Sequence, residues 1–211
     1  MKRIVFCDFD GTITVDETFV AVLKKFAPIL SAKLLPEMYA KRLTLREGVK
    51  QILQSIPSAS YPEILEFTKP QLIRPGLIEL LDFLEGQGVS FIVVSGGLRK
   101  MVEVVLDGIG IVHRVERIYA VDVDISSAYL KVISQYEGDT ELIAKVQVMD
   151  QYPADEKIAI GDSITDLNMG LQASVVFARS QLARYLDEHQ KPYIPWNDFL
   201  EIRDYLAKSW S

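Results

Sequence analysis

The fold is decided near the N-terminus, where the apolar run Ile4-Val5-Phe6-Cys7 leads into Asp8-Phe9-Asp10-Gly11-Thr12-Ile13-Thr14. A short apolar run of this kind is typical of a buried strand. Because side chains alternate along a strand, Asp8 and Asp10 leave its end on the same side. Two carboxylates so close repel each other unless a cation lies between them or one binds a proton. The glycine and threonine that follow favour a tight turn whose N–H groups can meet an anion.

Further apolar runs with strand character follow along the chain, and amphipathic helical patterns separate them. Strands that alternate with helices predict an α/β fold, a Rossmann-like parallel sheet with helices on both faces. The strands are expected at Ile4–Cys7, Val89–Val94, Lys157–Ile160 and Ser174–Ala178, and the helices at Gly76–Glu85, Leu98–Leu106, Ile164–Leu171 and Asn197–Trp210.

Two segments interrupt this alternation. Asp16–Lys69 contains no convincing strand, and its apolar residues recur at helical spacing. We interpret it as a small helical cap inserted after the first strand, so that residues 15–70 form the cap and residues 1–14 with 71–211 form the core. Arg117–Gln135 alternates between apolar and polar residues on either side of a turn, which predicts a hairpin flap.

The composition disfavours several classes of function. The 211 residues carry a formal net charge of −6, which argues against nucleic acid or an anionic membrane surface as a partner. No apolar run approaches the ~20 residues of a membrane helix, and the N-terminal run is too short for a signal peptide. We therefore expect a cytoplasmic monomer or homodimer. Cys7 is the only cysteine and is expected in the core, and His113 and His189 lie too far apart in sequence to suggest a zinc site.

Four signals with polar chemistry follow one another along the chain. The first is the pair Asp8 and Asp10. The second is Ser95-Gly96-Gly97, where a hydroxyl and the N–H groups after it could bind phosphate oxygens. The third is Lys145, a compact cation near the start of an amphipathic segment. The fourth is Gly161-Asp162-Ser163-Ile164-Thr165-Asp166, which follows a strand and carries two acids.

Three of these signals follow predicted strands, at the edge where open α/β sheets bind ligands. Carboxylates around one Mg²⁺ ion, with a hydroxyl and a lysine nearby, suit phosphoryl transfer. Plainer interpretations stay open for each signal. Ser95-Gly96-Gly97 could be a turn between strand and helix with no ligand, and Asp162 could be a helix cap with no metal. Lys131 or Lys157 could take the place of Lys145.

In this order and spacing, the signals resemble the four motifs of the haloacid dehalogenase-like phosphohydrolases, over residues 8–166. The resemblance implies that Asp8 attacks phosphorus and becomes an aspartyl phosphate. It also implies that Asp10 protonates the leaving oxygen and then activates water. The phosphate ligands that it implies are Ser95, Gly96 and Lys145, and the Mg²⁺ ligands are Asp8, the backbone carbonyl of Asp10, Asp162 and, in support, Asp166.

The helical insertion resembles the small cap of the phosphoserine phosphatase-like branch of that family. Glu17 stands where the branch often has an acid that faces the substrate. Phosphoserine phosphatases carry a cap stretch whose second arginine binds the substrate carboxylate, and the matching residues here are Thr44-Leu45-Arg46-Glu47-Gly48-Val49. Gly48 cannot make that bidentate pair, although Arg46 or Arg42 could compensate.

A closer resemblance is to the methionine-salvage phosphatases that act on 2-hydroxy-3-keto-5-methylthiopentenyl-1-phosphate. It implies a small phosphorylated metabolite as the substrate. The alternatives are a phosphoserine phosphatase or another small-metabolite phosphatase and, from a different class, a phosphate-binding regulatory module without turnover. The stretches that carry the resemblance are Phe26-Ala27-Pro28, Arg46–Val49, Val94–Gly97, Phe177-Ala178-Arg179 and Asp198–Arg203.

Overall fold

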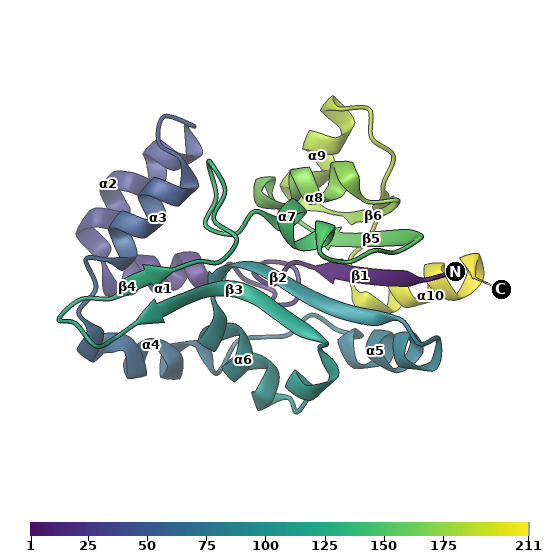
Figure 1. The fold of residues 1–211 in the computed structure, drawn as a ribbon, viewed down its shortest axis with the longest axis horizontal. Helices are drawn as coiled ribbons and strands as arrows, with labels where there is room; N and C mark the ends of the chain where they lie inside the picture. The colour runs from purple at the N-terminus through teal and green to yellow at the C-terminus, as the bar shows by residue number, and fades with distance from the viewer. Residues whose placement is uncertain (211) are drawn as a thin grey trace.

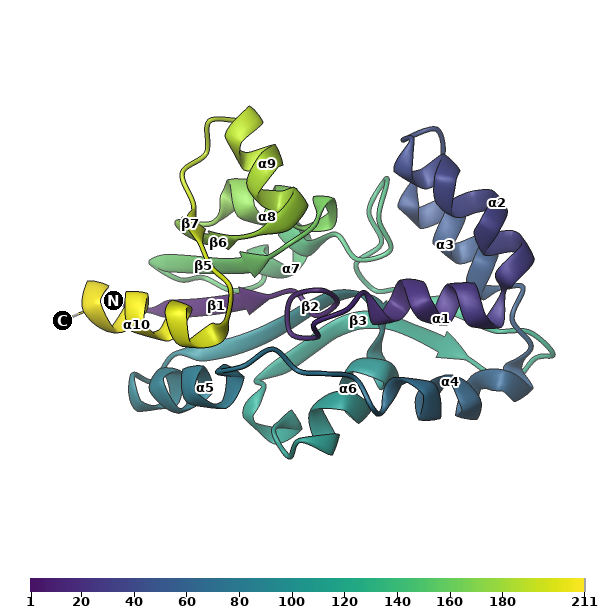
Figure 2. The same cartoon turned by 180° about the vertical axis from the view of Figure 1, so that it is seen from behind.

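A computed structural model describes residues 1–210, and these form one sheet of seven strands with helices on both faces (Figures 1 and 2). The strand order is β4-β3-β2-β1-β5-β6-β7. All neighbouring strands are parallel except β3 and β4, so the predicted fold class is confirmed. The strands are β1 (Arg3–Cys7), β2 (Ser90–Leu98), β3 (Arg117–Asp124), β4 (Lys131–Ile133), β5 (Glu156–Gly161), β6 (Val175–Ala178) and β7 (Ile194–Pro195).

Strand β1 lies at the centre of the sheet, and its apolar run is buried on both faces. Val5 pairs with Phe91 of β2 on one side and with Ile158 of β5 on the other. The chain leaves β1 toward β2 and later returns to β5 on the opposite side. The connections after β1 and β5 therefore diverge, and a crevice forms at the carboxyl ends of these two strands.

The core helices form a layer on each face of the sheet. On one face lie α5 (Leu77–Gly86), α6 (Arg99–Gly108) and α10 (Phe199–Ser209), and on the other lie α7 (Lys145–Asp150), α8 (Leu167–Gln172) and α9 (Ser180–Glu188) (Figures 1 and 2). Helix α5 buries its leucines, as the spacing predicts.

The segment between β1 and α5 contains four helices and, among the described residues, no strand. They are α1 (Thr18–Phe26), α2 (Pro28–Tyr39), α3 (Leu45–Leu53) and α4 (Tyr61–Thr68). Its two links to the core run side by side, because the Val15 N–H donates to the Leu72 carbonyl at 2.9 Å. Helix α4 packs on α6 of the core, α3 contacts strand β4, and α2 stands away from the sheet (Figure 1). The division at residues 15–70 stays a prediction.

The predicted hairpin is confirmed, since β3 and β4 pair antiparallel from Asp122 with Ile133 to Asp124 with Lys131. The turn of this hairpin is joined to the segment before α4. The Ser58 N–H donates to the Ala128 carbonyl at 2.9 Å, and the Leu130 N–H donates to the Ile56 carbonyl at 3.0 Å. The flap and the helical insertion are thus in contact.

Several boundaries differ from the sequence prediction. Strand β2 continues through the glycine pair to Leu98, with a register shift after Val94, whereas the strand was expected to end at Val94. A short 3₁₀ turn at Ile164–Asp166 precedes α8. Helix α9 and the short strand β7 were not predicted. Cys7 is buried in the core as expected, and no helix in residues 1–210 is long and apolar enough to cross a membrane.

Candidate active site

The turn after β1 brings the first acid to the carboxyl end of β5. Asp8 is buried, and its N–H donates to the Ile160 carbonyl at 2.9 Å. Gly11 has φ +78°, and a Cβ added there would lie 2.6 Å from Oδ2 of Asp162. Only glycine fits this close approach with this backbone angle. The Thr12 hydroxyl then donates to Oδ1 of Asp162 at 3.3 Å, which joins the first and fourth motifs.

The carbonyl groups of this turn are held by an arginine that the sequence motifs did not single out. Arg74 is buried just before α5, and its guanidinium donates to the Thr12 carbonyl at 2.9 Å and to the Gly11 carbonyl at 2.7 Å. The same side chain lies over the Trp196 ring, 5.4 Å from its centroid. Arg74 therefore fixes the backbone that follows the acid pair.

Asp10 contacts the start of the helical insertion. Its Oδ1 accepts a hydrogen bond from the Phe19 N–H in the first turn of α1, at 3.0 Å. Burial and the neighbouring Asp8 carboxylate raise the pKa of Asp10 to about 7. A carboxyl group with this pKa can both give and take a proton near neutral pH, as a general acid and base must.

Lys145 is the link between the first and fourth motifs. It is the first residue of α7, it is buried, and its Nζ lies 2.5 Å from Oδ1 of Asp8 and 2.5 Å from Oδ1 of Asp166. Burial alone would lower the pKa of the ammonium group, but the two carboxylates outweigh it and hold that pKa above its usual value. Of the three lysines considered from the sequence, Lys157 instead donates to the Met149 carbonyl.

The fourth motif is held by its own backbone. Oδ2 of Asp166 accepts from the N–H groups of Asp162 and Ser163, each at 3.0 Å, and Asp166 is fully buried. A Cβ at Gly161 would lie 2.6 Å from Cγ of Asp166, so glycine is required for space. The remaining oxygen of Asp166 is thereby aimed at Lys145.

Oxygen atoms of Asp8, Asp162 and Asp166 all lie within 4.8 Å of one another. Burial, together with the charges of nearby acids, raises the pKa of Asp8 to about 6 and that of Asp162 to about 8. The ammonium group of Lys145 pairs with Asp8 and Asp166 but not with Asp162, so the three acids outnumber the cation beside them. The donor set is made of carboxylate oxygens only, so the cluster could hold a hard divalent metal ion.

The second motif lies beside Asp10. Ser95 is fully buried, and its Oγ accepts a hydrogen bond from the Gly97 N–H at 3.0 Å. A Cβ at Gly97 would lie 3.0 Å from Oδ2 of Asp10, so the backbone passes close to this acid. Gly96 and Gly97 line a pocket at this edge of the sheet, whereas Ser95 does not.

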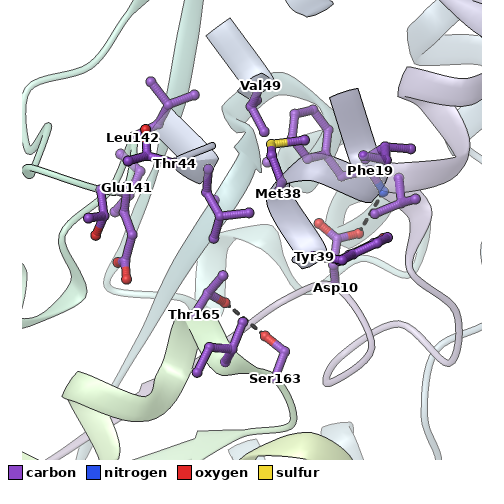
Figure 3. A pocket seen from close by; sticks show the side chains of 18 of the residues that line it. Asp10, Phe19, Met38, Tyr39, Thr44, Val49, Glu141, Leu142, Ser163 and Thr165 are labelled. Atoms are coloured by element: carbon purple, nitrogen blue, oxygen red, sulfur yellow. Dashed lines mark hydrogen bonds between the residues drawn. The ribbon is translucent and has the colours of Figure 1, made fainter. Parts of the chain in front are cut away.

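A pocket of about 520 Å³ opens between the helical insertion and the carboxyl edge of the sheet. Asp8, Asp10 and Lys145 line its inner end, and Glu17 lines it as well from an exposed position. Figure 3 shows Asp10 between Ser163 and Thr165 on one side and Phe19, Met38 and Val49 on the other. Glu141 is a further carboxylate in the lining, and burial raises its pKa to about 7.

Arg46, which the sequence suggested as a substrate ligand, does not line the pocket. Its guanidinium donates to the Gly138 carbonyl at 3.2 Å and lies 3.8 Å from the Glu137 carboxylate. Its N–H donates to the Thr140 carbonyl at 2.8 Å. Arg46 therefore ties α3 to the loop that precedes Lys145. Arg42 lines the pocket, but its guanidinium is paired with Glu37 at 2.7 Å.

The chain is similar in sequence to known proteins. The sequence profile of haloacid dehalogenase-like hydrolases matches residues 5–170. The chain is 52% identical to the 2-hydroxy-3-keto-5-methylthiopentenyl-1-phosphate phosphatase of Microcystis aeruginosa over 98% of both chains. It is 33% identical to the protein of the same name from Bacillus cytotoxicus, over 96% of this chain and 94% of that one.

Solved structures show the same fold. A phospho-aspartyl intermediate analogue of phosphoserine phosphatase superposes with a TM-score of 0.70 at 20% identity, over 97% of this chain and 98% of that one. A phosphoserine phosphohydrolase-like protein from Francisella tularensis superposes with a TM-score of 0.72 at 22% identity, over 97% and 99%. At these identities the likeness concerns the fold alone.

Proposed function

Because the chain belongs to the family of haloacid dehalogenase-like hydrolases, we propose that it is a phosphoric monoester hydrolase acting on a small phosphorylated metabolite. In the proposed reaction, a carboxylate oxygen of Asp8 attacks phosphorus, the bond from phosphorus to the ester oxygen breaks, and an aspartyl phosphate forms. Water then attacks the same phosphorus, and inorganic phosphate leaves Asp8.

Asp10 has the proton chemistry that both steps need. Its raised pKa of about 7 supports donation of a proton to the leaving alkoxide and the later removal of a proton from water. The hydrogen bond from the Phe19 N–H fixes one oxygen, which leaves the other free toward the reacting group. Asp10 is 2 residues from the nucleophile on the same strand end, so the two acids can act on one phosphorus.

Lys145 and Ser95, with the N–H groups that follow Ser95, are proposed to bind the phosphoryl oxygens, as the resemblance implies. Asp8, Asp162 and Asp166, with the Asp10 carbonyl, are proposed to hold Mg²⁺. When bound, this ion offsets negative charge on the phosphoryl group and on the acids. The oxygen-only donor set and the excess of negative charge support Mg²⁺ rather than a softer metal.

The observation that carries the proposal is the position of Lys145 Nζ, 2.5 Å from both Asp8 and Asp166. A buried cation between the nucleophile and the fourth motif gathers residues 137 positions apart around one point. A binding module without turnover would not need a proton donor of the Asp10 kind beside that point.

The test is the release of inorganic phosphate from p-nitrophenyl phosphate with Mg²⁺ and with a chelator. We expect metal-dependent release, loss of nearly all of it in Asp8→Asn, and no change in the control Asp16→Asn, whose side chain is exposed. An acid quench with ³²P-labelled substrate should leave label on the parent protein and none on Asp8→Asn. The absence of metal-dependent release would favour the regulatory module, and turnover by Asp8→Asn would refute the nucleophile.

We propose 2-hydroxy-3-keto-5-methylthiopentenyl-1-phosphate as the substrate. The support is the 52% identity over 98% of both chains to a protein named for that substrate. A panel of phosphorylated metabolites, assayed with Mg²⁺ at equal concentration, tests this choice. We expect 2-hydroxy-3-keto-5-methylthiopentenyl-1-phosphate to have the highest kcat/KM of the panel. A higher kcat/KM for phosphoserine would overturn the choice.

A further inference from the structure

One end of the pocket is lined by buried apolar side chains of the helical insertion. Phe19 and Leu23 come from α1, and Leu35 and Met38 come from α2; all four are buried and line the pocket. Figure 3 shows Phe19, Met38 and Val49 gathered at this end. The charged residues that also line the pocket from the insertion are exposed, and they are Glu17, Lys41, Arg42 and Glu47.

One of these apolar side chains occupies space that a missing side chain leaves open. Gly48 lies inside α3, where glycine costs a helix about 1 kcal/mol relative to alanine. A Cβ at Gly48 would lie 2.2 Å from Sδ of Met38 and 2.7 Å from its Cγ. The backbone angle at Gly48 is ordinary, so space and not conformation requires glycine here. Met38 is 5% exposed, and its side chain both packs against Gly48 and lines the pocket.

We infer that the pair formed by Gly48 and Met38 sets the depth of a subsite for an uncharged, apolar tail on the leaving group of the phosphate ester. This inference rests on the proposed phosphatase activity and adds which end groups the enzyme prefers. A pocket of about 520 Å³ is larger than a phosphate group alone needs. A carboxylate or ammonium group at the apolar end would lose its hydration without gaining a partner from Phe19 or Met38.

The experiment compares two esters whose leaving groups differ only in apolar length, ethyl phosphate and n-pentyl phosphate, each with Mg²⁺. The chemistry at phosphorus is the same for both, so the ratio of their kcat/KM values reports contacts with the tail. We expect the parent protein to favour n-pentyl phosphate by at least about tenfold, since even one methylene group in an apolar pocket can be worth about tenfold.

Gly48→Ala would push the flexible Met38 side chain into the pocket, and we expect the preference for n-pentyl phosphate to fall to about one. The matched control is Gly86→Ala at the end of α5, where an added Cβ meets nothing within 4 Å. It should leave the ratio unchanged. Met38→Gln keeps the length of the side chain and adds an amide to the wall, so it should also lower the ratio if Gly48→Ala fails to fold.

The outcomes separate the inference from the function on which it rests. If neither ester is hydrolysed with Mg²⁺ and p-nitrophenyl phosphate is not hydrolysed either, the proposed function fails. If p-nitrophenyl phosphate is hydrolysed and the two alkyl esters are not, the function stands and the tail subsite is wrong. If both are hydrolysed at equal kcat/KM by the parent protein, the function stands and the tail subsite is wrong. The tail subsite is also wrong if both variants lower the two rates by one common factor.

Discussion

Asp10→Asn should make the metal-free protein more stable at pH 8 while it removes activity. The pKa of Asp10 rises from 3.8 to about 7 in the folded protein. One pKa unit corresponds to about 1.4 kcal/mol, so the ionised carboxylate costs the folded state up to about 4 kcal/mol. Asparagine has almost the same shape, its carbonyl can still accept from the Phe19 N–H, and it carries no charge.

The direction in which stability changes with pH follows from whether the folded or the unfolded protein binds the proton. Between pH 4 and pH 7 the folded protein keeps a proton on Asp10 that the unfolded chain has released, so this group's stabilising contribution falls as the pH rises. Over the two pH units from pH 5 to pH 7, the contribution of Asp10 to the free energy of unfolding falls by about 3 kcal/mol. The advantage of Asp10→Asn over the parent should therefore grow by about 2–3 kcal/mol from pH 5 to pH 8, because Asp10 keeps some contact with water.

The assay is urea unfolding in a metal chelator at pH 5 and pH 8, with phosphate release measured on the same samples after Mg²⁺ is added. Asp16→Asn is the control, since Asp16 is exposed and its substitution should change the free energy of unfolding by less than about 0.5 kcal/mol. Activity of Asp10→Asn should fall by about 10²–10⁴-fold. An advantage that is equal at the two pH values, or absent at pH 8, would refute this account of the site.

Three other outcomes follow from the same geometry. Saturating Mg²⁺ should stabilise the parent protein at pH 8 by about 2.7 kcal/mol at a hundredfold excess over Kd, and a thermal-shift assay should show this gain lost in Asp162→Asn. Phosphoserine should be hydrolysed with a kcat/KM at least about 100-fold below that of the methylthiopentenyl phosphate. Efficient hydrolysis of phosphoserine would contradict the interpretation that Gly48 leaves the substrate carboxylate without its arginine partner. Arg74→Met should lower the free energy of unfolding by about 3 kcal/mol because two buried carbonyl groups lose a charged donor. The exposed Arg184→Met is its control, and equal unfolding midpoints for these two variants would contradict the role given to Arg74.

The strands of the sheet and the acids after them were predictable because their signals are local. An apolar run followed at once by a carboxylate fixes both the strand and the side of the sheet on which the acid lies, as at Asp8 and Asp162. Two such strands that end at the same edge then bring their acids together. Lys145 had no strand before it, and only its order relative to the other motifs pointed to it.

Arg74 escaped prediction because its partners are backbone carbonyls 62 and 63 residues away, and backbone groups leave no trace in the sequence. Arg46 was assigned to the pocket from its place in a motif. The structure turns it toward Glu137 and Gly138, whose positions depend on a loop with no regular pattern. The two residues of β7 are too few to give a period, and only their pairing with β6 defines them.

The contact between Arg46 and the loop at Gly138 and Thr140 has a thermodynamic consequence. That loop runs straight into Lys145, so α3 and the ammonium group that we propose to bind phosphate are parts of one structural linkage. Free energy that one end gains by ordering the linkage is available to the other end in equal measure. Binding of the alcohol product beneath the helical insertion and binding of inorganic phosphate should therefore be reciprocally cooperative. Once the alcohol departs, the protein should bind the remaining phosphate less tightly.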